Sequence, residues 1–293
     1  MRKITPFLLL VFLLFASCTS NSDKMLYPAK IKGKWGYIDN ETGEIAINPQ
    51  FDYAWGFNEG LARIKLDGYF GFINKNGKVV IEPQFDDAGG FNEGLAVIKL
   101  GGEYGYIDKN GNIVIRPQFD YADDFKEGLA RIELGRQYGY IDKNGKVVIE
   151  PQFEEAWWFE EGLAQIKLGD KYGYIDKNGK IAISPQFESA GDFHQGLASI
   201  KLDGKYGYID KSGKVVIKPQ FEDVGLGEGN FQEGLARVQL GGKWGFINKN
   251  GNIVINPQFE EAEDFHEGLA RVQLEWSGEW GYIDKTGKIV TKP

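Results

Sequence analysis

The sequence has little histidine, little cysteine and no excess of positive charge. Its 293 residues include two histidines and one cysteine, and the formal net charge is −8. A single cysteine cannot form an internal disulfide, and a Ser-His or Cys-His nucleophile has almost no histidine to draw on. The negative charge argues against binding to nucleic acid, whose phosphates require a basic surface, and against electrostatic docking on anionic lipid.

Long apolar runs are also absent after the first few residues. Glycine is abundant, with 40 residues, and aromatic residues make up 14% of the chain. Many glycines among many aromatics, without long apolar runs, are typical of β-structure with tight turns. The apolar content of 42% and the charged content of 26% are those of an ordinary soluble globular protein.

The first residues have the pattern of an export signal. Arg2 and Lys3 precede an apolar run, residues 7–15, that is too short to span a bilayer as a mature helix. The stretch "FASC" then places the only cysteine, Cys18, directly after two small residues. This stretch resembles the lipobox of bacterial lipoproteins, with Phe15 where leucine is usual. The alternative is an ordinary secretory signal in which the cysteine stands by chance.

The lipobox resemblance implies three segments. Residues 1–17 would be removed as a lipoprotein signal peptide, residues 18–28 would form the lipidated N-terminus and a polar tether, and residues 29–293 would form the folded domain. Thr19, rather than aspartate, follows the cysteine, which by the same resemblance favours the outer membrane of a two-membrane bacterium. Periplasmic and surface-facing orientations both remain open.

The rest of the chain repeats itself about every 34 residues. Glycine follows an aromatic residue at positions 36, 71, 105, 139, 173, 207, 245 and 281, and "PQF" recurs seven times from position 49 onward. Glu-Gly-Leu-Ala or a close variant lies between successive copies. A fixed period of this length is the signature of a tandem-repeat architecture.

The repeated string resembles the WG-repeat family. The Trp-Gly pair that gives the family its name is found at Trp35-Gly36, Trp244-Gly245 and Trp280-Gly281, and tyrosine or phenylalanine replaces tryptophan in the other copies. The resemblance covers residues 30–293. It implies a β-rich tandem-repeat protein, found in bacterial envelopes among other settings, and it carries over no catalytic residues because the family has no general activity.

Each copy predicts a three-stranded antiparallel meander. In residues 129–153, "LARIEL" alternates as a half-exposed strand, "YGYID" follows a tight turn, and "KVVIEP" follows the Asp-Lys-Asn-Gly turn and ends at Pro151. The linker "QFEEAWWFEEG" has Ala156 and Phe159 three residues apart, a spacing compatible with one helical turn before Gly162. Gly139 would let a neighbouring backbone or ring approach closely.

One such meander cannot fold alone, so the copies are expected to stack. Both faces carry apolar side chains, with Ile132 and Ile149 assigned to one face and Tyr140 to the other, and an isolated three-stranded unit buries too little surface. We therefore predict an all-β fold of eight tandem meanders. The stack would form an open superhelical solenoid or a propeller-like ring, and the lack of a fourth strand in the predicted unit favours the open form.

Few side chains suggest metal binding or catalysis. His194 and His266 share a position that holds Asn, Lys, Glu or Gln in other copies, so we interpret them as solvated. The "DKNG" aspartates fit a tight turn and lack the EF-hand spacing. Acidic pairs recur in most copies, as a solvated rim would: Asp86-Asp87, Asp123-Asp124, Glu154-Glu155 and Glu260-Glu261. We therefore predict no catalytic residue, no metal site and no cofactor.

The candidate binding residues are Trp55, Trp157 and Trp158. They lie between the linker alanine and phenylalanine, where other copies have glycine or an acidic residue. A large aromatic side chain at such a position suggests a sugar or protein contact. The alternative is that each tryptophan covers the edge of a neighbouring repeat, and Trp276 in the last inserted hairpin has the same two interpretations.

These observations predict a non-catalytic, lipid-anchored envelope protein that presents an extended acidic and aromatic surface for binding a protein or a glycan. Its partners would be a membrane, through the N-terminal lipid, and an envelope protein or glycan; nucleic acid is not expected. Two alternatives remain, a purely structural envelope scaffold or spacer and an enzyme acting on polysaccharide.

Overall fold

The computed structural model describes residues 25–225, 229–274 and 278–290, and within these ranges the chain is built of β-strands. The described residues contain no helix, and therefore none long and apolar enough to cross a membrane. Cys18, the predicted signal peptide and Trp276 lie outside the described residues. The predicted all-β class of tandem antiparallel sheets is confirmed.

The strands group into sheets that follow one another along the chain. Unit 1 contains β1 (Leu26–Ile31), β2 (Lys34–Asp39) and β3 (Ile45–Phe51); unit 2 contains β4 (Tyr53–Asn58), β5 (Leu61–Leu66), β6 (Tyr69–Asn74) and β7 (Val79–Phe85). Unit 3 contains β8 (Asp87–Asn92), β9 (Leu95–Leu100), β10 (Glu103–Asp108) and β11 (Ile113–Phe119). Unit 4 contains β12 (Tyr121–Ala122), β13 (Leu129–Leu134), β14 (Gln137–Asp142) and β15 (Val147–Phe153).

The later units keep the same order. Unit 5 contains β16 (Glu155–Glu160), β17 (Leu163–Leu168), β18 (Lys171–Asp176) and β19 (Ile181–Phe187). Unit 6 contains β20 (Ser189–Ala190), β21 (Leu197–Leu202), β22 (Lys205–Asp210) and β23 (Val215–Phe221). Units 7 and 8 share one six-stranded sheet of β24 (Leu235–Leu240), β25 (Lys243–Asn248), β26 (Ile253–Ala262), β27 (Leu269–Leu274), β28 (Trp280–Asp284) and β29 (Ile289–Val290).

The linker is a fourth strand, so the expected helical turn is wrong. In unit 5 the linker forms β16, which pairs with β17 through Ala156↔Ile166 and Phe159↔Ala164. The register shifts between Ala156 and Phe159, because a β-bulge inserts the two tryptophans there. Because of the bulge, Ala156 and Phe159 lie on the same face of the strand although they are three residues apart. The same spacing is found on one face of a helix.

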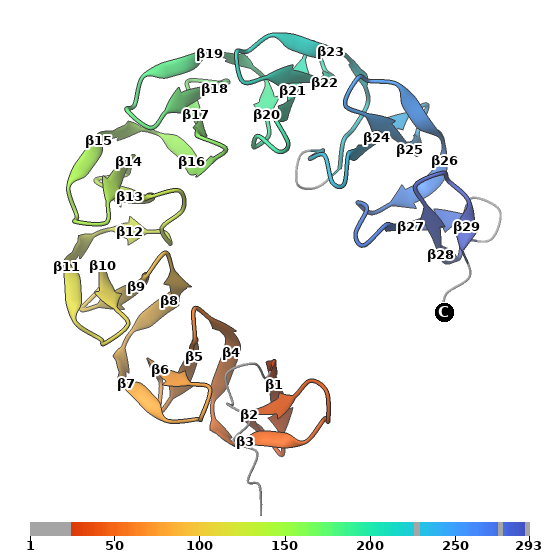
Figure 1. The fold of residues 1–293 in the computed structure, drawn as a ribbon. Helices are drawn as coiled ribbons and strands as arrows, with labels where there is room; N and C mark the ends of the chain where they lie inside the picture. Colours follow the sequence, from red (N-terminus) through yellow and green to blue (C-terminus); the bar gives the residue numbers. More distant parts are fainter. Residues whose placement is uncertain (1–24, 226–228, 275–277, 291–293) are drawn as a thin grey trace, which may run out of the picture.

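The units are arranged along an open arc (Figure 1). The linker strands β8, β12, β16 and β20 lie on its inner side, and β7, β11, β15, β19 and β23 lie on its outer side. Unit 1 and unit 8 are separated by a gap, and no strand of one pairs with a strand of the other in the described ranges. The arc is therefore the incompletely closed, propeller-like form; unit 1 has the three predicted strands, and units 2 to 6 have a fourth.

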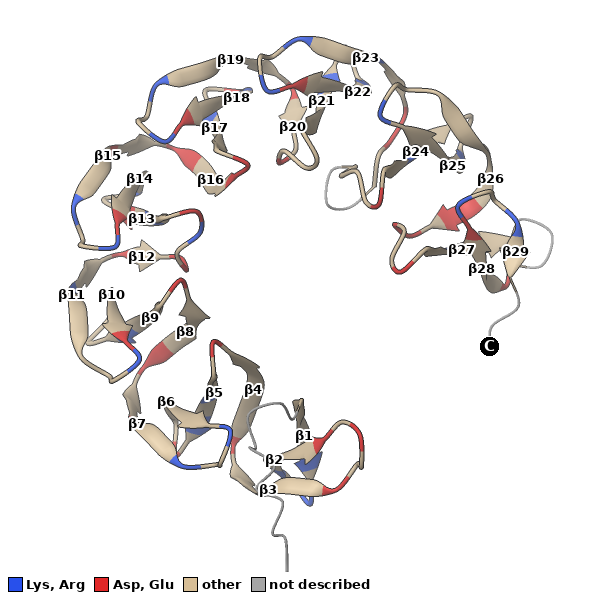
Figure 2. Ribbon diagram, viewed as in Figure 1, with Lys and Arg blue, Asp and Glu red and all other residues tan. Residues whose placement is uncertain are grey.

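Charge is distributed differently on the two sides of the arc (Figure 2). Aspartate and glutamate recur on the hairpins that point to the inside, whereas lysine and arginine recur on the turns of the outer side. Acidic residues are therefore more frequent than basic residues on the inner hairpins, and several of the turn glutamates are paired with lysines.

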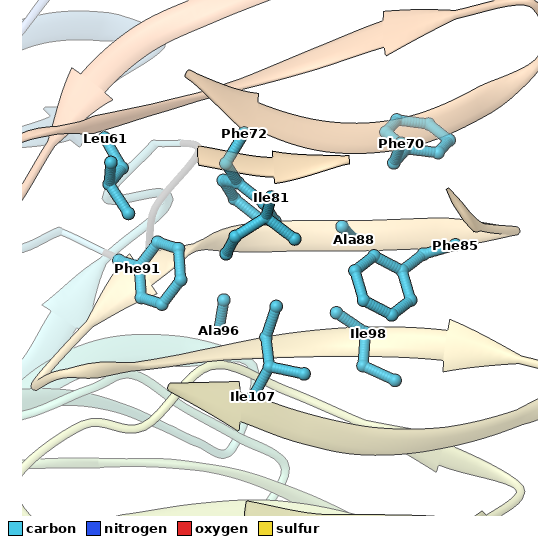
Figure 3. Packing of buried hydrophobic residues seen from close by; sticks show 10 residues of the cluster. All are labelled: Leu61, Phe70, Phe72, Ile81, Phe85, Ala88, Phe91, Ala96, Ile98 and Ile107. Carbon is cyan, nitrogen blue, oxygen red and sulfur yellow. The ribbon is translucent and has the colours of Figure 1, made fainter. Parts of the chain in front are cut away.

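The hydrophobic core lies between units. The cluster in Figure 3 joins Phe72 and Ile81 of unit 2 to Phe91 and Ile98 of unit 3, all of them buried. Unit 4 uses both of its faces in this way, since Ile132 belongs to the cluster shared with unit 3 and Tyr140 to the cluster shared with unit 5.

One face assignment was wrong. Ile149 packs with Tyr140 rather than with Ile132, because the register shifts between Tyr140 and Ile141. Gly139 is explained by a second register shift, between Tyr138 and Tyr140: a Cβ there would lie 2.5 Å from the Ile149 carbonyl oxygen and 2.6 Å from the Pro151 nitrogen. The backbone that approaches Gly139 thus belongs to its own sheet.

An aromatic pair spans each boundary between units. In each pair an aromatic residue from the middle of one unit contacts a phenylalanine of the next, with ring centroids 4.8–5.0 Å apart. The hydroxyl of Tyr106 also donates to the Asp123 carbonyl of the next unit at 2.6 Å. A buried tyrosine hydroxyl needs such a partner, so this bond fixes the position of the next linker strand.

A glutamate in the turn before Gly-Leu-Ala connects units 2, 3, 4, 5 and 7 to the unit that follows each. Glu127 has a φ of 52°, in the left-handed region that favours glycine or asparagine. Its carboxylate accepts a hydrogen bond from the Gly162 backbone N–H at 2.9 Å and lies 3.0 Å from Lys177 Nζ, both in unit 5. Burial alone would raise the pKa of Glu127, but Lys177 and the Gly162 N–H outweigh burial and hold the pKa below its ordinary value.

Removing this connection should weaken the array at one boundary. We expect Glu127→Ala to lower the free energy of unfolding by about 1 kcal/mol, because a partly exposed ion pair and one hydrogen bond are lost. Glu267→Ala is the matched control, since Glu267 has the same turn conformation, φ 51°, while its side chain is 88% exposed. Urea unfolding followed by circular dichroism measures both, and equal losses would contradict the assignment.

Candidate functional site

The linker strands lie on the inner side of the arc, and the two residues at the bulge position differ between units. In unit 2 these are Trp55 and Gly56, in unit 3 Gly89 and Gly90, and in unit 5 Trp157 and Trp158. In unit 4 Asp123 and Asp124 hold the equivalent positions directly after β12. The strand pairing on both sides of the bulge is otherwise the same. Differences between units at these two positions therefore change the inner surface without changing the fold.

Trp55 packs within unit 2. Its ring lies 4.0 Å from the guanidinium carbon of Arg63 and 5.8 Å from the ring of Phe70. It is half-buried against the core cluster that joins units 2 and 3, and its carbonyl oxygen accepts the Tyr37 hydroxyl at 2.8 Å. These contacts explain Trp55 by packing and leave little of its ring for a ligand.

Trp157 and Trp158 are neighbours with different surroundings. Trp157 is half-buried, with its ring 5.7 Å from that of Tyr172 in the same unit. Trp158 is 41% exposed, and Lys126 Nζ lies 5.8 Å from its ring. Of the three predicted tryptophans, Trp158 is thus the one with a large free surface on the inner side.

Trp158 lines a cavity of about 340 Å³ between units 3, 4 and 5. We call it the Trp158 cavity, and its other lining residues are Asn92, Asp123, Asp124, Phe125 and Lys126. Its lining combines one aromatic face with amide, carboxylate and ammonium groups. This combination suits a ligand that has both polar groups and an apolar face.

A second cavity, of about 200 Å³, adjoins the first at Asp123 and Asp124. We call it the Gly89 cavity, and it is lined by Arg63, Asp87, Ala88, Gly89, Val97, Ile98, Tyr104, Tyr121, Ala122, Asp123 and Asp124. A Cβ on Gly89 would come within 2.5 Å of Asp124 Oδ1 and 2.6 Å of Val97 Cγ1. The cavity therefore depends on the missing side chain at this bulge.

The two adjacent aspartates have different environments. Asp123 accepts hydrogen bonds from the Tyr121 hydroxyl at 2.8 Å and from Arg131 Nε at 2.6 Å. Asp124 accepts one from Asn92 Nδ2 at 2.8 Å through Oδ2, while its buried Oδ1 has no hydrogen-bond partner among the described residues. Burial raises the pKa of Asp124, the charge of Asp123 adds to this, and Arg63 and Asn92 oppose it.

Arg63 faces Asp124 from unit 2. Its guanidinium donates to the Ala88 carbonyl oxygen of unit 3, whereas its buried Nε has no hydrogen-bond partner within the described ranges. Burial lowers the pKa of Arg63, and the nearby charges of Asp87 and Asp124 oppose this effect. Side chains from three successive units thus converge on the Gly89 cavity.

Other predicted residues are placed apart from this site. His266 lies on an inner hairpin with its side chain 90% exposed, as expected for a solvated position, and His194 is half-buried. No group of three or more His, Cys, Asp or Glu residues in the described part of the chain could hold a metal ion. Of the acidic pairs, Asp123-Asp124 lines both cavities, and Asp87 lines the Gly89 cavity.

The glycine pair was the signal that sequence reasoning missed. From the sequence, glycine or an acidic residue at this position indicates only that the position is exposed, whereas the structure places Gly89 at a cavity. Val97 is a second departure, because the same position holds arginine, glutamine or serine in the other four-stranded units. Unit 3 therefore lacks the large side chains that units 2, 4 and 5 have at one or both of these positions, and unit 6, with Gly191 and Ser199, lacks them too.

The fold and the comparisons define the class of protein: a propeller-like tandem β-repeat array. The crystal structure of the eukaryotic initiation factor is similar, with a TM-score of 0.59, 10% identity, and coverage of 91% of this chain and 84% of that chain. The dihydro-heme d1 dehydrogenase NirN has a TM-score of 0.46 at 11% identity, covering 91% and 72%. Kluyveromyces lactis Hsv2 has 0.44 at 8% identity, covering 92% and 96%.

The sequence itself places the chain in a family. The WG containing repeat matches residues 35–70, 70–104, 104–136, 138–172, 172–206, 206–244, 244–275 and 280–293. The chain therefore belongs to the WG-containing repeat family, as the Trp-Gly pairs had indicated. No curated protein matched the chain in a sequence comparison. The structural likeness to the initiation factor, at 10% identity, shows the fold alone.

The raised pKa of Asp124 predicts how stability changes with pH. In the folded chain the ionisation of Asp124 is disfavoured. The free energy of unfolding therefore falls as the pH rises from the unfolded-state pKa through the folded-state pKa. Asp124→Asn should therefore match the parent chain below about pH 4 and become more stable than the parent towards neutral pH.

Asp52 provides the control of opposite sign. A hydrogen bond from Lys34 lowers the pKa of Asp52, so its charge stabilises the fold above the unfolded-state pKa and this contribution is lost in acid. Asp52→Asn should be less stable than the parent at neutral pH and equal to it in acid. Urea unfolding across this pH range tests both variants, and a neutral-pH loss for Asp124→Asn would refute the assignment.

Proposed function

We propose that this protein is a non-catalytic binding module of the bacterial cell envelope, anchored by a lipid on Cys18. The inner side of the arc would bind an envelope protein or glycan, and the outer membrane is the favoured location. The observation that carries the binding proposal is the Trp158 cavity, where an exposed aromatic ring lies beside polar groups from neighbouring units. Membership of the WG-containing repeat family is consistent with this role.

The geometry of the arc supports binding on its inner side. The linker strands bring the variable bulge positions of successive units to one concave surface (Figure 1). Asn58 Nδ2 donates to Asn92 Oδ1 at 3.1 Å, and Asn92 in turn donates to Asp124, so polar groups of three units form one connected row. A row of this kind offers an extended ligand several contacts at once.

Trp158 should be required for this binding. We expect immobilised mature protein to retain protein or carbohydrate from an envelope extract, and Trp158→Ala to retain at least several-fold less, because an exposed aromatic anchor is lost. Trp280→Ala is the matched control, since Trp280 is 42% exposed but lies in unit 8.

Equal retention by both variants would contradict the inner-surface proposal and favour a structural scaffold. The enzyme alternative needs convergent carboxylates, which the Gly89 cavity has in Asp87, Asp123 and Asp124. If the protein releases reducing ends from the retained carbohydrate, it is an enzyme and the non-catalytic proposal is wrong.

The anchor is tested separately. Lipidation requires the Cys18 thiol, and each buried methylene of an acyl chain contributes about 0.8 kcal/mol to membrane binding. Cys18→Ser should move the protein from the detergent phase to the aqueous phase in a partition experiment, and labelled fatty acid should no longer be incorporated. A Cys18→Ser variant that still enters the detergent phase would refute the lipid anchor.

A further inference from the structure

Every boundary between units buries the same two faces. We call the side of a unit that packs on the preceding unit its front face, and the side that packs on the following unit its back face. On the front faces of units 2 to 8 one alanine and two isoleucines or valines are at most 1% exposed, as Ala62, Ile64 and Ile73 are in unit 2. On the back faces of units 1 to 7 the aromatic residue after the repeated glycine, Tyr37 in unit 1, is at most 1% exposed.

Unit 1 leaves its front face uncovered in the described part of the chain. Tyr27 lies opposite Ile38 in the register of β1 and β2. The equivalent pair in unit 2 is Ala62 and Ile73, and both are fully buried. Tyr27 is instead 47% exposed, and Ala29 and Ile38 are partly exposed. The positions that every later unit buries therefore reach solvent in unit 1.

Unit 8 leaves its back face uncovered in the same way. Tyr282, the aromatic residue after the repeated glycine, is partly exposed, and Trp280 is 42% exposed where Trp244 of unit 7 is 7% exposed. The tyrosines equivalent to Tyr282 in units 1, 3, 4, 5 and 6 each donate a hydrogen bond to a backbone carbonyl of the following unit. No further unit packs on Tyr282 in the described ranges, so its hydroxyl lacks this acceptor.

The front face of unit 1 is apolar rather than polar. The end units of a repeat array usually carry a polar outer face that keeps the array in solution, whereas unit 1 has Tyr27 at the position of an alanine. Unit 1 also has no linker strand in the described ranges. In unit 3 that strand places Phe91 opposite Ala96 and against Phe72 of unit 2. Tyr27 therefore supplies an aromatic ring on a face that lacks the linker phenylalanine.

The two uncovered faces are the two halves of one interface. Inside the chain an aromatic residue of a back face contacts a phenylalanine of the next front face at each of seven boundaries. Tyr282 offers the first ring of such a pair and Tyr27 offers the second, and the gap in the arc leaves both ends accessible (Figure 1). A second copy of this chain is the partner that carries both halves.

An anionic bilayer fits the front face of unit 1 less well. In unit 2 the turn after the middle strand packs through Gly77 on Ile47 of the preceding unit, so the same turn of unit 1 borders its front face. This turn carries Glu41 and Glu44, both exposed, where the turn of unit 2 has two lysines. Anionic headgroups attract basic segments and repel carboxylates.

We propose that the back face of unit 8 in one copy docks on the front face of unit 1 in a second copy, with Tyr282 against Tyr27. A heterologous contact of this kind either closes into a ring or continues as an open helix. The association is independent of the ligand of the Trp158 cavity, and it extends the inner side of the arc from one copy to the next. The sequence has Thr291 where unit 7 has Ile255, so the contact should be weaker than the boundaries inside the chain.

Sedimentation velocity of the mature chain tests this contact, with Cys18→Ser to keep the chain free of lipid. We expect the mean mass to rise reversibly with concentration, with a dissociation constant on the order of 10–100 μM, as for a small transient interface. Tyr27→Asp and Tyr282→Asp should each raise this constant at least tenfold, because each places a charge in an apolar contact.

Tyr69→Asp is the matched control. Tyr69 is 50% exposed in unit 2, at a position that holds lysine, glutamate or glutamine in the other units, so this variant should associate like the parent chain. An equimolar mixture of Tyr27→Asp and Tyr282→Asp should form dimers and nothing larger, because one intact back face then meets one intact front face. All three variants change side chains that are at least partly exposed, and urea midpoints equal to that of the parent chain check that they fold.

A parent chain that stays monomeric up to about 500 μM, well above the expected dissociation constant, would overturn the proposal. Equal weakening by Tyr69→Asp, or a mixture of the two end variants that does not associate, would overturn it as well. An effect of only one end variant would show a contact between like ends, which contradicts the head-to-tail arrangement. Retention of envelope material by Trp158 is measured separately, so a failure here leaves the proposed function standing.

Discussion

The fold depends on burial between successive units. A four-stranded sheet of about thirty residues cannot cover both of its own faces, so each unit uses the next as its missing core. Tyr140 shows the arrangement at one boundary: its ring contacts Phe159 of the following unit, and its hydroxyl donates to the Trp157 carbonyl oxygen there. The same residue thus supplies apolar contact and fixes the register of the neighbouring linker strand.

This constraint explains why part of the repeat is fixed and part is free to change. The aromatic pair, the glycine beside Pro151 and the Glu-Gly turn all contact neighbouring backbone or the next unit. At the bulge only the backbone carbonyl is needed, because that is the atom that accepts the tyrosine hydroxyl. The two bulge side chains can therefore vary, and the variation that creates the cavities occurs there.

The sequence predicted the class and the stacking because both follow from periodicity. It did not predict the fourth strand, since Ala156 and Phe159 are three residues apart and only the bulge places them on one face. Trp158 was found by its size at a variable position, but Trp55 had the same signal and packs on Arg63 instead. The cavity at Gly89 was not predicted, because a missing side chain leaves a cavity only where neighbouring residues do not fill the space. Which residues are its neighbours is known only from the three-dimensional structure.

The gap in the arc has a mechanical consequence. Since no strand joins the first sheet to the last in the described ranges, small rotations at successive boundaries add up instead of cancelling. The distance between the two ends can then change appreciably while every sheet keeps its hydrogen bonds. A sealed ring would have to break a seam to change its diameter by the same amount, so this molecule can adjust its curvature to objects of different width.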